Sequence, residues 1–126
     1  MKPLKPPPSI TGQHIEDLAS THLQERGLHL LERNFRCRQG EIDLIMTHGD
    51  VLTFIEVRYR KNDYYGSPLE SVTPQKRAKI ITTAQYYLLQ NPQASNQPMR
   101  FDVVAASSDV HGNINFDWVQ DAFQEN

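Results

Sequence analysis

Gly40-Glu41-Ile42-Asp43-Leu44-Ile45 and, one turn later, Phe54-Ile55-Glu56-Val57-Arg58 are the two segments that decide the fold of this 126-residue chain. Both are rich in apolar and β-branched residues, which predicts two strands. His48-Gly49-Asp50 between them is typical of a tight turn, so the strands are expected to form a hairpin. Each strand also contains a carboxylate among apolar residues, which is unfavourable unless something compensates its charge.

The turn sets which residues of the hairpin face each other. A two-residue Gly49-Asp50 turn with glycine first pairs His48 with Val51. Asp43 then lies directly opposite Glu56, with Cβ atoms about 4.5–5.5 Å apart. A three-residue turn would shift the register by one residue and put the two acids on opposite faces.

Two facing carboxylates repel each other unless one is protonated or a cation lies between them. Mg²⁺ or Mn²⁺ is the expected cation, because Mg²⁺ takes oxygen ligands and keeps several waters. The carbonyl of Val57 is a further candidate ligand beside Asp43 and Glu56. A metal here would polarise a phosphate and lower the pKa of bound water. Arg58, two residues past Glu56, shares its sheet face and is expected to contact that phosphate.

Internal ion pairs are the alternative explanation of the same hairpin. In the predicted register Glu41 lies opposite Arg58, and these two residues would pair while Asp43 pairs with another neighbour. The domain would then bind other proteins, and the acids would hold no metal.

The remaining pattern predicts an α/β fold with a mixed sheet of about five strands flanked by helices, in the order α-β-β-β-α-β-β. The expected elements are a helix from residue 11 or 12 to 26, strands over 28–38, 41–47 and 51–60, a helix from 74 to the Asn91-Pro92 stop, a strand over 99–106 and a short strand around 114–118. They form one domain over 12–126, after a disordered Pro-rich tail over 1–11.

Glu16 lies at the edge of the apolar face of the first helix, from which it can reach the sheet on which that face packs. It is therefore expected to supply or orient another metal ligand. The apolar face is made by Ile15, Leu18, Ala19, His22 and Leu23.

Charge is unevenly distributed along the chain. The net charge is −2, but residues 26–79 have ten Lys and Arg against seven Asp and Glu, and the segment after residue 100 is acidic. A local basic surface for nucleic acid is therefore possible without a basic chain, although solvated charge is the commoner explanation of such a pattern. The candidate backbone-binding residues are Arg33, Arg36, Arg38, Arg60, Lys76 and Arg77, interleaved with Tyr59, Tyr64 and Tyr65.

Lys76 has a second possible role. It lies in the first turn of the second helix, and a site with arginine at position 58 could recruit its amine. Alternatively its stem packs on the sheet and its charged head is solvated.

Other kinds of site are disfavoured. The one cysteine, Cys37, cannot form an intrachain disulfide, which fits a cytoplasmic protein. The five histidines show no metal-ligand spacing. No apolar stretch reaches the length of a membrane span, and residues 1–9 lack the apolar region of a signal peptide.

Several segments together resemble the bacterial YraN family. They are Gly12-x-x-x-Glu16-x-x-Ala19, Arg33-Asn34-x-Arg36, Gly40 to Ile45, Phe54-Ile55-Glu56-Val57-Arg58-x-Arg60, Gly66, Val72, Lys76 and Arg100-Phe101-Asp102-Val103-Val104. That family is similar to the restriction-endonuclease-like PD-(D/E)xK superfamily, and its pattern is closest to archaeal Holliday-junction resolvases.

The resemblance implies a restriction-endonuclease-like sandwich and a role for each matching residue. Glu16 matches the helix acid, Asp43 the central metal-binding acid and Glu56 the acid of the E-x-K element. It further implies Mg or Mn as cofactor, structured or damaged DNA in preference to RNA as partner, and, by analogy, a homodimer. Arg58 occupies the position of the family's lysine and cannot lose a proton, so a non-catalytic nucleic-acid-binding module of the same fold is the alternative.

Overall fold

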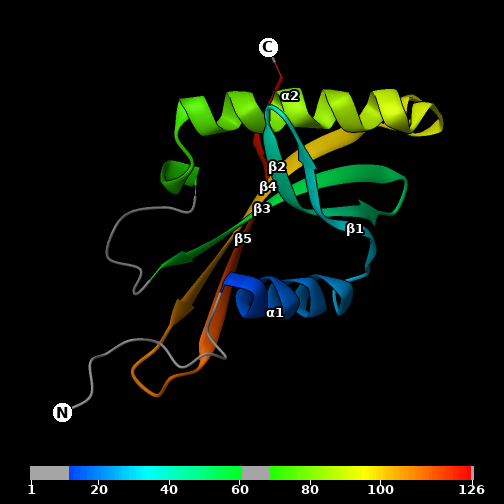
Figure 1. Cartoon of the computed structure of the whole chain (residues 1–126). Coiled ribbons are helices and arrows are strands. Elements are labelled where there is room, and N and C mark those ends of the chain that lie inside the picture. The colour runs from blue at the N-terminus through cyan, green and yellow to red at the C-terminus, as the bar shows by residue number, and fades with distance from the viewer. Residues whose placement is uncertain (1–11, 61–68, 126) are drawn as a thin grey trace.

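The computed structural model describes residues 12–60 and 69–125. Their elements follow the predicted order α-β-β-β-α-β-β, with two short 3-10 helices (η) that were not predicted (Figure 1). They are α1 (Gly12–Gln24), β1 (Leu28–Cys37), β2 (Gly40–His48), β3 (Val51–Arg60), η3 (Leu69–Ser71), α2 (Pro74–Gln90), η4 (Pro92–Asn96), β4 (Met99–Ser108) and β5 (Ile114–Phe123). The predicted tail over 1–11 and the tyrosines at 64 and 65 lie outside the described residues.

The sheet is mixed and has five strands in the order β1-β2-β3-β4-β5. β3 and β4 are parallel, and the other neighbouring strands are antiparallel. A parallel pair needs a long crossover, which α2 provides. The α/β fold class and the five-stranded mixed sheet are therefore confirmed.

The two helices cover opposite faces of the sheet (Figure 1). On the α2 face the core includes Phe54, Ile80 and Phe101. On the α1 face it includes Leu23, Leu44 and Val104. Because both faces are covered, the central strands are apolar on both sides, as the sequence predicted.

Local sequence explains the helix ends. The hydroxyl of Thr73 accepts a hydrogen bond from the backbone N–H of Lys76 at 3.2 Å, and Pro74 begins α2. α1 ends at Gln24, two residues before the predicted end at Arg26. The amide of Arg26 instead bonds the carbonyl of Leu23, a tighter turn that leads into Gly27 at φ +95°.

β5 is longer than the short strand predicted, because a buried carboxylate holds its far end. Asp102 on β4 is fully buried and binds the Arg100 guanidinium at 2.8 and 3.0 Å. It also accepts hydrogen bonds from the Trp118 indole and the Asp121 amide, each at 2.9 Å. These bonds fix an irregularity in the β4–β5 register, with Asp121 at φ +53°.

Among the described residues, no helix is long and apolar enough to cross a membrane.

Candidate metal and nucleic-acid site

The β2–β3 hairpin has the predicted register. His48 pairs with Val51, and the pairing continues to Leu44 with Ile55. Gly49 has φ +63°, as a turn with glycine first requires. Asp43 and Glu56 are the next residues along the two strands, and the backbone pairing stops just before them.

β2 turns sharply at Asp43. Ile42 packs on the α2 side of the sheet, whereas Leu44 packs on the α1 side. Residues two apart in a flat strand share a face, so the strand twists between these two. The twist explains why the pairing ends, and it leaves space in which side chains meet between the strands.

The carboxylate of Asp43 takes the place of the missing backbone partner. Its Oδ2 accepts a hydrogen bond from the Val57 amide at 2.8 Å. The N–H and C=O of one strand residue point to the same side. By this rule the Val57 carbonyl also points toward β2, so it remains a candidate metal ligand.

Three acids from three elements converge at this gap. Asp43 and Glu56 are buried, with 8% and 4% of their surface exposed. Glu16 reaches them from α1, as its edge position predicted, and its Oε1 is buried and accepts no hydrogen bond. The hairpin brings two of the acids together, and only the packing of α1 adds the third.

Mutual proximity and burial perturb all three acids. Burial, and then the charge of Asp43, raises the pKa of Glu56 to about 7. The same two causes raise the pKa of Glu16 to about 7. Burial also raises the pKa of Asp43, although bonds from the Val57 amide and from Glu56 oppose the rise. The backbone hydrogen bond from Val57 favours the ionised form of Asp43.

Two cations approach the same oxygen of Glu56. The Lys76 amine lies 3.3 Å from Oε2, and the Arg58 guanidinium lies 3.7 Å from it. Both cations are more exposed than the acid, with about 40% of each side chain accessible (39% and 41%). Lys76 thus lies where an amine can act at the acid cluster.

The alternative pairing of Glu41 with Arg58 is wrong. Glu41 binds Arg36 of β1 at 2.8 Å, since the β1–β2 register puts those two residues opposite each other. Beyond Ile55, β3 no longer pairs with β2. Arg58 therefore does not lie opposite Glu41, and its guanidinium lies near Glu56 instead.

Arg33 and Asn34 are part of the acid cluster's surroundings. Arg33 lies 3.8 Å from Glu16 and also binds Asp17, so this predicted nucleic-acid residue is engaged by acids. The side chain of Asn34 lies near Glu16 and opposes the rise in the pKa of this acid, a role that sequence reasoning missed. Asn34 has φ +54°, a conformation that asparagine tolerates better than most residues. The sequence signal that could have pointed to Asn34 was its place between Arg33 and Arg36 in the family pattern.

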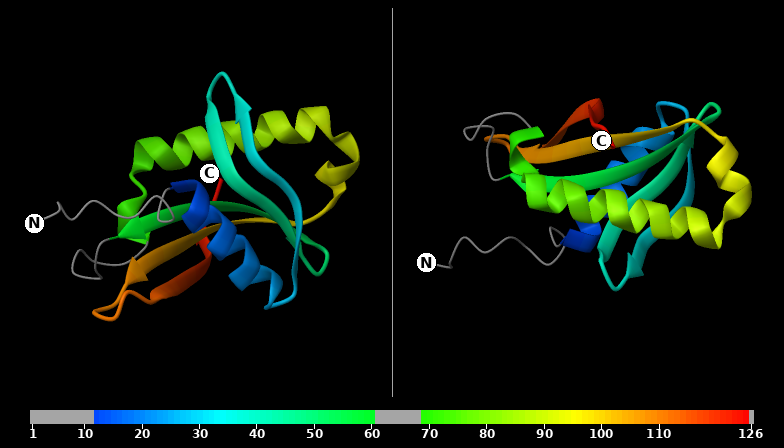
Figure 2. Two further views of the ribbon diagram at one scale, coloured as in Figure 1. Left: turned by 60° about the horizontal axis from the view of Figure 1, so that its bottom comes forward. Right: turned by 90° about the horizontal axis from the view of Figure 1, so that it is seen from above.

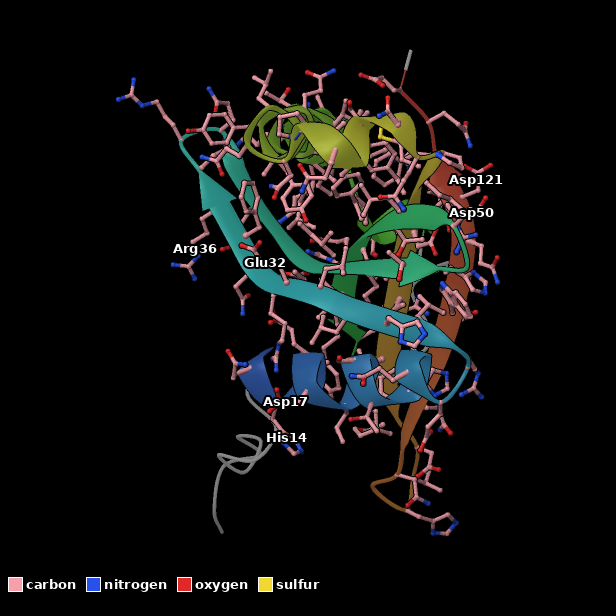
Figure 3. The ribbon with its side chains drawn as sticks, turned by 90° about the vertical axis from the view of Figure 1, so that its right-hand side faces the viewer. His14, Asp17, Glu32, Arg36, Asp50 and Asp121 are labelled. Carbon is pink, nitrogen blue, oxygen red and sulfur yellow. The ribbon has the colours of Figure 1, made fainter. Side chains whose placement is uncertain are left out.

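The other predicted nucleic-acid residues differ in how exposed they are and in what they bind. Arg36 and Arg38 are exposed near the end of β1, and Figure 3 shows the Arg36 side chain extending away from the ribbon. Arg60, at the end of β3, is half-buried. Arg77 instead bonds the carbonyls of Val72 and Leu69 at 2.9 and 3.1 Å, so it joins η3 to α2.

The oxygen atoms of Asp43, Glu56 and Val57 fit magnesium or manganese better than a metal that takes all its ligands from the protein. In residues 12–60 and 69–125, no three His, Cys, Asp or Glu side chains form a ready-made ion site. Mg²⁺ typically uses only one or two carboxylates and keeps waters. Asp43, Glu56 and the Val57 carbonyl match that requirement, with Glu16 close enough to orient a water.

The fold and this site define an α/β protein with a buried acid cluster at the point where two strands separate. The chain belongs to the Uncharacterised protein family UPF0102, whose profile matches residues 15–106. This agrees with the resemblance noted in the sequence, since the match includes all three acids.

Relatives match this chain over most of their own length. A UPF0102 protein of Nitrosococcus oceani is 49% identical over 113 residues, 90% of each chain. One of Pseudomonas fluorescens is 46% identical over 113 residues, 90% of this chain and 92% of its own. One of Saccharophagus degradans is 47% identical over 116 residues, 92% and 94% of the two chains.

Proposed function

We propose that this protein is a metal-dependent endonuclease that binds structured DNA, such as junctions or damaged DNA, and cleaves its phosphodiester bonds. One observation carries the proposal: buried Asp43 and Glu56 meet where β2 and β3 separate, and Lys76 and Arg58 both approach Glu56. Buried acids held beside cations in this way are unfavourable for stability alone and are common at functional sites.

Each residue has a distinct role in the proposed reaction. Asp43, Glu56 and the Val57 carbonyl would hold Mg²⁺ or Mn²⁺, which supplies an activated water and charge neutralisation when bound. Glu16 would orient a water through its unpartnered Oε1. Arg58 would bind the phosphate through its guanidinium, which cannot act as a base.

Lys76 would perform the part of the family's lysine. Its amine reaches the same Glu56 oxygen from α2 that Arg58 reaches from β3. An amine can donate hydrogen bonds to a bound water and to phosphate oxygens, as the lysine of an E-x-K element would. The departure at position 58 is therefore compatible with hydrolysis.

The test is a cleavage assay on branched, single-stranded and duplex DNA, and on RNA, with Mn²⁺ or Mg²⁺. Asp43→Asn and Glu56→Gln should each abolish cleavage. Glu25→Gln, at an exposed position just after the end of α1, is the matched control and should retain it. Cleavage that persists unchanged in the Asp43→Asn, Glu56→Gln double variant would contradict the assignment.

A non-catalytic nucleic-acid-binding module is the second candidate, favoured by one observation: Arg58 replaces the lysine expected two residues after Glu56. It predicts DNA binding without cleavage under every metal condition. In that case neither Arg58→Lys nor Lys76→Ala alters cleavage, because there is none. Sedimentation with and without a branched DNA would also test the homodimer that the resemblance implies.

A further inference from the structure

We propose that the recess between the β1–β2 turn and α2 is a subsite for a nucleotide phosphate. Its place beside the reacting bond rests on the proposed function, whereas its affinity for phosphate does not. We define the turn recess by Arg38, Gly40, Glu41, Lys76, Lys79 and Ile80, which line it.

The charge of the turn recess favours an anion. Arg38 enters from the turn, and Lys76 and Lys79 enter from one side of α2. Glu41 also lines the recess, but Arg36 binds its carboxylate at 2.8 Å. Three cations against one neutralised acid are suited to phosphate, which accepts several charge-assisted hydrogen bonds.

Close packing holds the turn against α2. A Cβ built at Gly40 would lie 3.2 Å from the Thr83 hydroxyl and 3.6 Å from the Lys79 Cβ. Thr83 is buried, bonds the Lys79 carbonyl at 2.7 Å and contacts the Cys37 sulfur at 3.8 Å. The glycine of the Gly40-Glu41-Ile42-Asp43 motif therefore allows the close approach that forms one wall of the recess.

Lys76 connects the recess to the acid cluster. It lines the recess and also lies 3.3 Å from Glu56. The β1–β2 turn crosses beside α2 and extends past it (Figure 2). A chain passing from the acid cluster to the recess would thus stay in contact with Lys76 before it reached Lys79 and Arg38.

The size of the recess indicates one nucleotide unit. Its volume is about 350 Å³, near the lower end of the range for small-molecule sites, about 300–1,000 Å³. It shares Lys76 with the acid cluster, so a phosphate bound there would belong to a nucleotide close to the reacting one. The subsite is therefore expected to bind a phosphate regardless of base identity.

The test titrates ¹⁵N-labelled protein, in EDTA, with thymidine 3′,5′-bisphosphate, with inorganic phosphate and with thymidine. We expect saturable shifts of the Gly40 and Glu41 amides with both phosphate compounds and none with thymidine. Lys79→Gln should weaken bisphosphate binding about tenfold or more, the effect of one charge-assisted contact. Arg26→Gln removes the same charge from an exposed arginine near the end of α1 and should leave the affinity unchanged.

Several results separate the subsite from the proposed nuclease. Bisphosphate binding that persists in Asp43→Asn, with cleavage lost, supports both. Lys79-dependent binding by a protein that cleaves nothing supports the subsite and removes the nuclease proposal. Absence of saturable shifts at millimolar bisphosphate overturns the subsite even if DNA is cleaved. Equal weakening of bisphosphate binding by Lys79→Gln and Arg26→Gln also overturns the subsite, because the loss would then reflect only the net charge of the protein. Arg38→Gln is a second variant that tests the subsite independently of Lys79.

Discussion

The Lys76 amine lies 3.3 Å from Oε2 of Glu56, nearer than the Arg58 guanidinium at 3.7 Å. The two cations come from α2 and β3, elements separated by η3 in the chain. If the site hydrolyses phosphodiesters, the lysine amine available to Glu56 therefore comes from α2 and not from β3.

Replacing Lys76 by alanine should lower the cleavage rate by about 10²–10³-fold, the usual effect of removing one group that stabilises developing charge. Lys76→Arg should restore binding of DNA but only part of the rate, since arginine keeps the charge but lacks the compact, rotatable amine. Single-turnover cleavage and DNA affinity, measured side by side, separate the two effects. Equal cleavage rates for Lys76→Ala and the parent protein would show that Lys76 lies near Glu56 without contributing to cleavage.

Arg58→Lys should raise a weak cleavage rate, because it restores an amine two residues after Glu56. The measurement is the rate on the best substrate at saturating Mn²⁺. A lower rate would instead show that Arg58 is a phosphate ligand whose two-pronged geometry lysine cannot reproduce.

Glu56→Gln should stabilise the metal-free protein at high pH. The pKa of Glu56 is raised from its ordinary 4.5 to about 7 by burial and the nearby Asp43. As pH rises through that interval, the unfolded chain loses a proton that the folded protein retains, so stability falls. Removing the acid should therefore raise the free energy of unfolding by about 2–3 kcal/mol at pH 8.

The same variant should give no gain near pH 4.5, where Glu56 is largely protonated in the folded protein. Urea unfolding in EDTA at both pH values measures the difference. The exposed Glu25→Gln is the control and should show no such pH dependence. A pH-independent gain for Glu56→Gln would indicate a packing effect.

Mn²⁺ should stabilise the parent protein, and more strongly above pH 7 than below it. Metal binding requires ionised acids, and Glu16 and Glu56 both have a pKa of about 7. At a hundredfold excess over Kd the stabilisation is about 2.7 kcal/mol. Thermal unfolding with increasing Mn²⁺ measures it, and Asp43→Asn should remove it; an unaltered response in that variant would place the metal elsewhere.

Gly40→Ala should destabilise the protein by about 1–2 kcal/mol, because Gly40 has φ +156° and its new methyl group would press on Thr83. Gly12→Ala is the matched control, since a Cβ there meets no atom within 4 Å. It should be neutral or slightly stabilising in its helix. Denaturant unfolding of both variants provides the comparison, and equal stabilities would mean that the turn does not need its glycine.

Local patterns were sufficient for the order of elements and for the hairpin. The His48-Gly49-Asp50 turn fixes the register from His48–Val51 to Leu44–Ile55, so that part of the hairpin follows from turn chemistry alone. The predicted direct pairing of Asp43 with Glu56 does not form, because the strands separate just before these two residues. The edge position of Glu16 on α1 likewise indicated that it would reach the sheet. The ends of α1 and β5 were less accurate, because a tightened last turn and the distant Asp102 set them.

Contacts between distant segments could not be predicted in the same way. Arg36 opposes Glu41 only because β1 pairs with β2, which left Arg58 for Glu56. Asn34 reaches Glu16 only because β1 and α1 pack together.

The sequence by itself determined that two acids share one hairpin and that a third can reach them, because strand and helix periodicity are local properties. Tertiary structure decided which cations join them. Lys76 meets Glu56, and the turn recess forms, only when α2 crosses over the sheet and packs against the β1–β2 turn. That packing depends on buried contacts between residues far apart in the chain, such as Gly40 and Thr83, which no local pattern specifies.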